Sequence, residues 1–135
     1  MELTKSMVTS ASGLRVQGER MRILAENIAN ANSSSMTPGA DPYRRKIMTF
    51  VQTLDEASGA KTVEVGNVTV DKSPFISRYD PGNPGADAQG YVKLPNVDAL
   101  IEMIDMKEAQ RSYEANLSAI ENAKHMISRT VDLLR

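Results

Sequence analysis

The chain has 135 residues and a formal net charge of −1, with 41% hydrophobic and only 4% aromatic residues, no Trp and no Cys. Charges of both signs are mixed along it, which excludes a broad basic surface for nucleic acid; the lack of Cys excludes a disulfide framework and thiolate metal sites. With eight Met and so few aromatic residues, the composition favours packed helices over a thick, self-sufficient core.

The N-terminal segment is predicted to be a long helix. From Leu3 to about Ala31, apolar residues recur at alternating spacings of four and three, which is the pattern of a heptad seam. The seam has large residues at Met7, Leu14, Met21 and Ile28, and small residues at Ala11, Gly18 and Ala25. Gly18 costs about 1 kcal/mol of helix propensity relative to Ala, and close packing against a neighbouring backbone would offset that cost.

A ladder of alternating charge lies beside the seam of this helix and is interpreted as a solvated face; it comprises Arg15, Glu19, Arg22 and Glu26.

A loop follows this helix. After Asn30 the sequence ANSSSMTPGADPYRRK contains Pro38 and Pro42, which end any helix, and serines that favour local turns.

A small β unit is predicted in the middle of the chain. KIMTFVQ has the character of a short strand. In KTVEVGNVTVDKS, valines alternate with other residues on both sides of Gly66-Asn67, which predicts a short β-hairpin that turns there. The alternating positions are Val63, Val65, Val68 and Val70.

The stretch DPGNPGADAQGYVKLPNVD, from Asp80 to Asp98, is rich in turn-forming residues and precedes a second long helix. Either Asn96 or Asp98 is able to cap that helix. No Pro or Gly occurs from there to Arg135, so the helix is expected to be on the order of 55 Å long. Its predicted seam runs through Met103, Met106, Gln110, Tyr113, Leu117, Ile120, Lys124, Ile127, Val131 and Leu134.

These elements predict a mainly α protein with a long, antiparallel, coiled-coil-like pair of terminal helices and a small β-containing middle. The expected division is a terminal-helix domain, residues 1–32 and 96–135, and a middle region of loops and a short hairpin, residues 33–95. The middle region is too small to cover both seams, and two helices alone bury little apolar surface. We therefore expect the remaining seam surface to pack against other chains.

No chemistry of catalysis or ligand binding is predicted. His125 has no Cys or His cluster and no HExxH motif around it, so a structural or surface role is expected. No phosphate-binding glycine loop or nucleophile elbow occurs either, so we expect no enzyme activity, cofactor, metal or small-molecule substrate. Turn and capping roles are favoured over a calcium site for four aspartates, Asp41, Asp80, Asp87 and Asp98.

Basic and aromatic side chains flank the predicted strands. Arg44, Arg45 and Lys46 are interpreted as protection of a strand edge or as a salt bridge to a partner, in preference to an anion site. Three tyrosines have an amphipathic character that suits either an interface anchor or core packing; they are Tyr43, Tyr91 and Tyr113.

Three blocks carry more information than their periodicity. LAENIANANSSSMTPGADPYRRK, YDPGNPGADAQGYVKLPNVD and EMIDMKEAQRSYEAN resemble, in this order and spacing, the family of flagellar rod and hook axial proteins. IANANSSSMTP is similar to a signature shared across that family, and the second block is similar to its proximal-rod subunits. The matching loop residues are Asn27, Asn30, Asn32, Thr37, Pro38, Tyr43, Arg44, Arg45, Asp80, Pro81, Gly82, Gly90, Tyr91, Pro95, Asn96 and Val97.

The resemblance implies a structural subunit of the proximal rod in the periplasmic part of the basal body. Its terminal helices would line the export channel while the middle makes outer contacts and the rod transmits motor torque. Implied partners are further copies, other proximal and distal rod proteins, the adaptor at the export gate and MS ring, and the flagellar type III export apparatus. The N-terminal residues contain no apolar run of secretory type, which agrees with export without a cleaved signal.

Two other classes remain open at this point. A helical adaptor or export chaperone would bind a partner through an exposed seam without entering a filament. A wall hydrolase would need paired carboxylates in a cleft, and no such pair is indicated.

Overall fold

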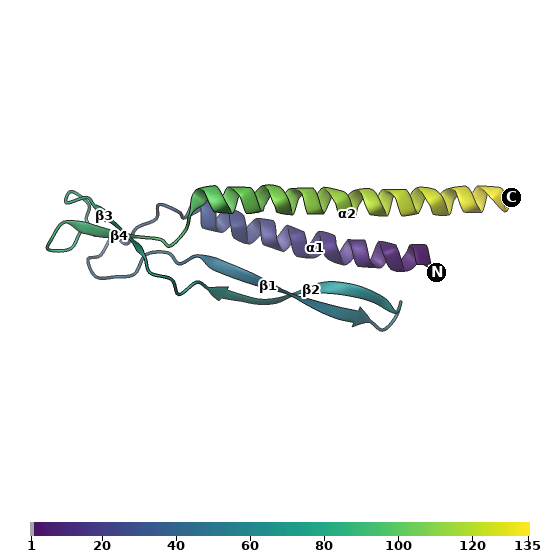
Figure 1. Ribbon diagram of the computed structural model, residues 1–135, viewed down its shortest axis with the longest axis horizontal. Helices are drawn as coiled ribbons and strands as arrows, with labels where there is room; N and C mark the ends of the chain where they lie inside the picture. Colours follow the sequence, from purple (N-terminus) through teal and green to yellow (C-terminus); the bar gives the residue numbers. More distant parts are fainter. Residues whose placement is uncertain (1) are drawn as a thin grey trace. The chain divides into compact units, whose positions relative to one another are not determined.

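In a computed structural model, residues 2–135 are described and form two helices and four strands (Figure 1). The elements in chain order are α1 (Glu2–Ala29), β1 (Lys46–Asp55), β2 (Ala60–Val70), β3 (Ile76–Tyr79), β4 (Tyr91–Leu94) and α2 (Ala99–Leu133). β1 pairs with β2, and β3 with β4, in separate two-stranded sheets. The predicted fold class is confirmed: the terminal helices pack together, with small antiparallel hairpins between them in sequence.

The second helix begins where the capping chemistry predicted. Asp98 Oδ1 accepts hydrogen bonds from the backbone N–H groups of Leu100, at 3.0 Å, and Ile101, at 3.4 Å. Asp98 is therefore the N-cap of α2, and the first free amides of the helix are satisfied. Asn96, the alternative cap, makes other contacts that are described below.

The predicted turn at Gly66-Asn67 is wrong, because both residues lie inside the continuous strand β2. The chain instead reverses between β1 and β2, where Gly59 has a φ of 68° and its N–H donates to Asp55 O at 2.7 Å. Asp55 Oδ2 also accepts from Ser58 N at 3.0 Å. These local bonds make DEASG the turn. Gly66 serves packing, because a Cβ there would lie 2.8 Å from Thr49 Oγ1 across the sheet.

The turn-rich stretch also contains a strand that the sequence did not indicate. β4 pairs antiparallel with β3, with Ile76 opposite Leu94 and Tyr79 opposite Tyr91. The two tyrosine rings pack edge to face, with centroids 5.4 Å apart. Asp80–Gly90 is thus the connection of a hairpin. Gly90 has a φ of 86°, a conformation that only glycine adopts readily.

The chain divides into two compact units. Unit 1 contains the described residues up to Met21, Met48–Asn67 and Lys107–Arg135; unit 2 contains Arg22–Ile47 and Val68–Met106. The buried residues of unit 1 are small; they include Ser12, Val16, Ala60, Ala109 and Ala123. Unit 2 buries Ile23, Leu24, Val92, Leu94 and Val97 together with two polar side chains, Asn27 and Glu102.

Within unit 1, hydroxyl groups join α1 to β2. Thr9 Oγ1 donates to Lys61 O at 2.8 Å, and Ser12 Oγ accepts from Val63 N at 3.1 Å. Ser12 is completely buried. These two residues hold the hairpin against the helix, a role that no local sequence pattern indicates.

Candidate assembly surfaces

A polar cluster around two buried side chains, Asn27 and Glu102, fixes the geometry of unit 2. The polar cluster comprises Asn27, Tyr43, Arg45, Asn96 and Glu102. Asn27 Nδ2 donates to Glu102 Oε2 at 3.1 Å and to Lys46 O at 2.9 Å. Its Oδ1 accepts from the Tyr43 hydroxyl at 2.7 Å and from Lys46 N at 2.9 Å. The amide of Asn27 is thus fully satisfied, as its burial requires.

Arg45 extends this cluster. Its guanidinium forms an ion pair with Glu102 and lies 3.6 Å from Asp71. Asn96 accepts from Arg45 N at 2.9 Å and donates to Asp71 O at 3.0 Å and Ser73 O at 3.1 Å. Arg45 and the segment from Asp71 to Ser73, which are far apart in the sequence, are thereby tied to the start of α2.

The ionic environment shifts several pKa values in this unit. The hydrogen bond to Glu102 raises the pKa of Arg45, and burial raises the pKa of Tyr43. Hydrogen bonds from Ser73 lower the pKa of Asp71, and the hydrogen bond from Lys46 lowers the pKa of Glu26. The shifts of Arg45, Asp71 and Glu26 favour the charged forms, so these ion pairs persist at neutral pH.

The basic triplet is therefore used inside the chain. Arg44 lies over the Phe75 ring, with its guanidinium carbon 4.2 Å from the centroid. Lys46 Nζ lies 2.8 Å from Glu26 Oε2. The predicted roles in edge protection or in a bridge to a partner are not what these contacts show. The expected solvated ladder is accurate for Arg15, Glu19 and Arg22, which are exposed.

The predicted α1 seam faces away from the interior. In α1 the buried positions Ser12, Val16, Ile23 and Asn27 follow helical spacing. At about 100° per residue, the predicted seam lies roughly on the opposite side. Its members are half-buried at Met7, Leu14, Gly18, Met21 and Ile28 and exposed at Ala11 and Ala25. This stripe is thus accessible in the single chain.

The small residue that contacts the other helix is Gly13 and not Gly18. A Cβ at residue 13 would lie 2.7 Å from Asn116 Nδ2, in unit 1. A Cβ at residue 18 would have no atom of the described chain outside its own helix backbone within 4 Å. The open space beside Gly18 is therefore available to another molecule.

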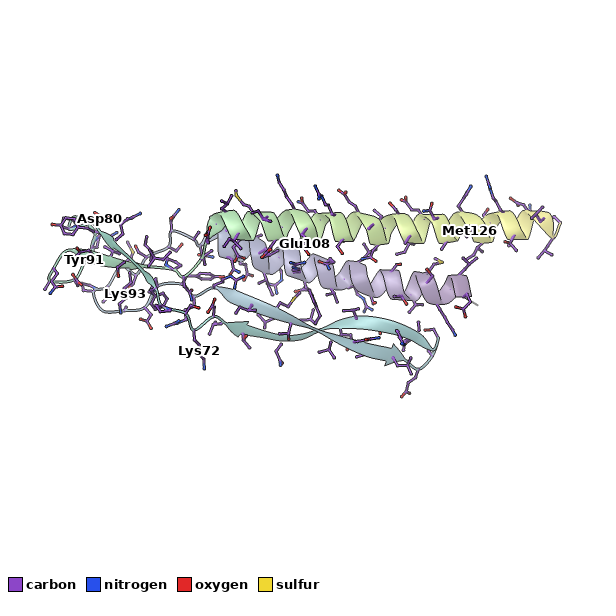
Figure 2. The ribbon with its side chains drawn as sticks, in the orientation of Figure 1. Lys72, Asp80, Tyr91, Lys93, Glu108 and Met126 are labelled. Atoms are coloured by element: carbon purple, nitrogen blue, oxygen red, sulfur yellow. The ribbon has the colours of Figure 1, made fainter. Side chains whose placement is uncertain are left out.

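The inner seam of α2 is shifted by one residue in half of its positions. Met106, Tyr113, Ile120 and Ile127 are half-buried, in agreement with the predicted register. The intervening inner positions are Glu102, Ala109, Asn116 and Ala123, each one residue before a predicted position. Met103, Leu117, Val131 and Leu134 are exposed. Figure 2 shows the side chain of Met126, which is also exposed, on the same helix.

The matching loop residues divide by burial. Asn27, Gly90, Pro95 and Val97 are buried; Asn30, Tyr43, Arg44, Arg45, Asp80 and Asn96 are half-buried; Asn32, Thr37, Pro38, Pro81, Gly82 and Tyr91 are exposed. The first two groups include four of the five members of the polar cluster, all but Glu102. The exposed group leaves loop surface open for contacts outside the chain.

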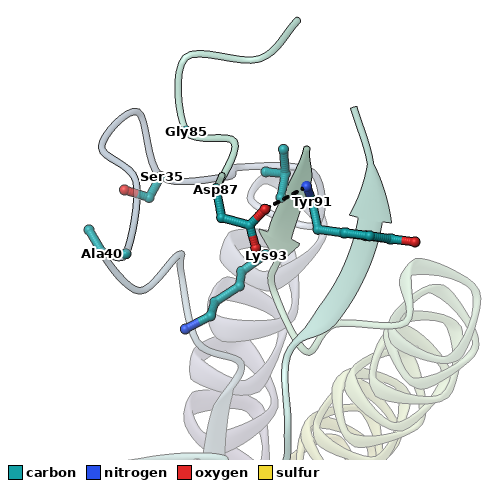
Figure 3. A pocket seen from close by; sticks show the side chains of 8 residues that line it. Ser35, Ala40, Gly85, Asp87, Tyr91 and Lys93 are labelled. Atoms are coloured by element: carbon teal, nitrogen blue, oxygen red, sulfur yellow. Dashed lines mark hydrogen bonds between the residues drawn. The ribbon is translucent and has the colours of Figure 1, made fainter. Parts of the chain in front are cut away.

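A pocket of about 250 Å³ lies between the loops of unit 2 (Figure 3). Its acidic group, Asp87, accepts from Tyr91 N and Gln89 N, both at 2.9 Å. Its basic group, Lys93, lies 3.8 Å from Asp41. Gly85 approaches so closely that a Cβ would lie 1.9 Å from Ser35 O. The bonds of Asp87 thus shape the connection between β3 and β4, whereas Lys93 and the close approach of Gly85 to Ser35 link this hairpin to the loop that follows α1.

Neither metal chemistry nor a membrane span is indicated. Among residues 2–135 no three acidic, His or Cys side chains group as a metal site would require. Asp87 and Asp98 have the expected turn and capping roles, and His125 is exposed on α2. In the same described range, neither helix combines the length and the apolar character needed to cross a bilayer.

A groove of about 530 Å³ in unit 1 is lined by α1, α2 and both strands of the first hairpin. Phe50, Val16 and Val63 give it apolar walls. Gln17 also lines it, and Gln17 Oε1 is a buried side-chain acceptor that has no hydrogen-bond partner among the described residues. An unsatisfied acceptor at a groove wall suits contact with a donor from another molecule.

Comparisons with known proteins agree with this structural character. Residues 88–133 match the family described as flagellar basal body rod FlgEFG protein C-terminal. The chain is 53% identical over 133 residues to the flagellar basal-body rod protein FlgC of Agrobacterium fabrum, with 98% of this chain and 96% of that protein covered. It is 40% identical over 135 residues to FlgC of Escherichia coli O6:H1, with 98% of each covered. Against FlgC of Bacillus subtilis the identity is 34% over 143 residues, with 95% of each covered.

Proposed function

Because the chain belongs to the FlgC family of flagellar basal-body rod proteins, we propose that it builds the proximal part of the rod through contacts made by its terminal helices. It is a structural subunit of the flagellar basal-body rod. As a rod protein, it assembles with other rod subunits. The proposal concerns which surfaces make these contacts and which neighbours they meet.

The observation that carries this proposal is the apolar surface left open on both helices. The α1 seam lies opposite the buried face, and α2 exposes Met103, Leu117 and Val131. Exposed apolar surface of this extent on a small chain is typical of an interaction site. In the proposed rod, residues 1–32 and 96–135 form the axial core and the wall of the export channel, and residues 33–95 make outer contacts.

The hairpin loop Asp80–Gly90 supplies part of those outer contacts in the proposal. Pro81, Gly82 and Tyr91 are exposed, while Asp80 N and Gly90 O are joined by a hydrogen bond of 2.9 Å. A loop that is shaped before binding loses less conformational entropy on assembly. This supports docking of the loop on neighbouring subunits as a shaped surface.

The proposed partners extend to both ends of the proximal rod. They are further copies of this chain, other proximal and distal rod proteins, and the adaptor at the export gate and MS ring. The chain reaches the periplasm through the flagellar type III apparatus without a cleaved signal, and the finished rod transmits torque. A helical adaptor or export chaperone would use the same exposed faces, so the experiment below must separate the two functions.

The test is electron microscopy of basal bodies purified from cells lacking this gene, beside a complemented strain. Rings without rod, hook or filament, with rods restored on complementation, are the expected result. Antibody labelling of the chain in the restored basal bodies distinguishes a rod subunit from a chaperone, which would be absent from them. Intact rods in the deletion strain would remove the chain from the axis.

A further inference from the structure

The first two turns of α2 expose an apolar face. The α2 apolar face comprises Leu100, Ile101, Met103 and Ile104, with exposed fractions of 51 to 66%. At about 100° per residue these four lie on the side of the helix away from the buried Glu102. Asp98 precedes the face and Asp105 lies at its edge. The apolar surface is bordered by acidic Asp98 and Asp105 at its start and edge, and by Lys107 and Glu108, of opposite sign, one turn later.

The end of β2 carries a surface of opposite character, also in unit 2. The valine groove has a volume of about 460 Å³ and is lined by Lys46, Val68, Thr69, Val70 and Lys72. Val68 and Val70 are each about half exposed, at 48% and 47%. Lys46 is held by Glu26 at 2.8 Å, and Lys72 projects away from the strand (Figure 2). The groove is apolar, and the positive charge at its border is that of Lys72, since Glu26 balances Lys46.

We propose that the α2 apolar face of one copy docks in the valine groove of the next copy. The inference rests on the proposed function, since it names the two surfaces through which neighbouring copies of an assembling subunit would meet. The argument is charge complementarity around matching apolar centres: Asp98 and Asp105 at the edge of the α2 apolar face of one copy meet Lys72 at the edge of the valine groove of the next. Complementary borders fix register and orientation, while apolar burial supplies the association energy.

This contact joins two different surfaces of the same chain. Such a head-to-tail contact leaves one face and one groove open at the ends of every pair, so further copies add until a ring closes or a helical assembly extends. An isologous contact, in which one surface meets its own copy, would stop at a dimer. The proposed pairing is therefore of the kind that generates an extended assembly.

The natural absence of Cys allows a direct test by disulfide cross-linking. Cells are made to produce two variants together, one carrying only Val70→Cys and the other only Ile101→Cys. Each chain then holds a single thiol, so every disulfide joins two chains. Basal bodies are purified and oxidised, and linked peptides are identified by mass spectrometry. The expected result is that links from residue 70 to residue 101 predominate over 70–70 and 101–101 links.

A matched control replaces Val70→Cys by Val51→Cys. Val51 lies on β1 outside the groove and is equally exposed, at 46% against 47% for Val70. The 51–101 link is expected at a several-fold lower yield, and an equal yield would overturn the proposal. Adding Lys72→Glu to the Val70→Cys chain is expected to lower the 70–101 yield several-fold, whereas Lys72→Arg retains it. Lys72 is exposed, so neither change threatens the fold.

The outcomes separate this inference from the proposed function. If the chain is present in the basal bodies but the 70–101 link is absent, the inference falls and the rod assignment stands. If 70–70 links predominate, the contact is isologous and the inference also falls. If the chain is missing from the basal bodies of a strain with intact rods, both fall.

Discussion

Asn27 on α1 donates a hydrogen bond of 3.1 Å to the carboxylate of Glu102 on α2, and both side chains are buried. The carboxylate is balanced by Arg45, which approaches from the start of β1. A buried charge is tolerated only where such partners are complete. The polar cluster is thus a specific connection between the helices of unit 2, formed without an apolar contact at its centre.

Asn27→Ala is expected to destabilise the purified chain. The substitution removes the partner of the Tyr43 hydroxyl, of Lys46 N and of Glu102. Buried polar groups left without partners cost about 2 to 3 kcal/mol in total here, so the urea midpoint should fall. Asn32→Ala is the matched control, because Asn32 is exposed. Equal midpoints for the two variants would show that the cluster does not stabilise the fold.

Gly85→Ala is expected to separate the connection between β3 and β4 from the loop between α1 and β1 that contains Ser35. A Cβ at residue 85 would lie 1.9 Å from Ser35 O, which belongs to the backbone and has little freedom to move. The expected cost is about 1 to 3 kcal/mol. Hydrogen exchange should quicken at Ala86 N and Gly90 N, whose bonds lie in this loop. Gly82→Ala is the control, since the nearest atom there is 3.9 Å away, and it should leave exchange unchanged.

Stability is expected to fall on acidification. The pKa of Glu26 lies below its ordinary value of 4.5 because Lys46 donates a hydrogen bond to the carboxylate. As pH falls, the Glu26 carboxylate is protonated in the unfolded chain before it is protonated in the folded chain. Its contribution to stability is therefore complete above its ordinary pKa and is lost as pH falls through its pKa in the folded chain. The melting temperature should change little between about pH 7 and 5 and decline below.

Glu26→Gln provides the check on that assignment. The variant should be less stable at neutral pH, and the upper part of its acid decline should be shallower than that of the unmodified chain. The part that remains belongs to groups such as Asp71, whose pKa is also lowered, from an ordinary value of 3.8. An identical pH dependence would exclude Glu26 as a contributor.

Gly18→Leu is expected to block assembly without unfolding the chain. Residue 18 has open space beside it in the single chain, whereas a side chain at residue 13 meets Asn116. Circular dichroism should therefore show a normal melting temperature for Gly18→Leu and a lowered one for Gly13→Leu, with an overpacking cost of about 1 to 3 kcal/mol. Swimming assays should show loss of motility for Gly18→Leu. Normal motility would contradict the role of the α1 seam as a rod contact.

The local signals in the sequence were sufficient for both helices and narrowed the cap of the second helix to Asn96 or Asp98, of which the structure shows Asp98. They were insufficient for the first hairpin, because Gly66-Asn67 resembles a turn while the true turn depends on hydrogen bonds to Asp55. Glycine in β2 instead prevents a clash with Thr49 on the neighbouring strand. The role of this glycine depends on the residue opposite it in the sheet, which a local sequence pattern does not reveal.

The polar interior explains the remaining differences. Ser12 and Glu102 have side chains that usually face water, so a hydrophobic pattern places the seams elsewhere. Ser12 is buried because its hydroxyl bonds to β2, and Glu102 because Arg45 and Asn27 reach it. Compensation of this kind comes from distant residues, which is why only half of the α2 seam was predicted correctly.

The bond between Asn27 and Glu102 spans 75 residues of sequence. Closing a loop of that length costs about 4 kcal/mol of chain entropy, and contacts of such high contact order form slowly. Asn27 can bond to Tyr43 and Lys46 early, but its partner Glu102 is available only once the last third of the chain is present. The connection between the helices of unit 2 is therefore made last, and the folding of α2 determines when unit 2 becomes rigid.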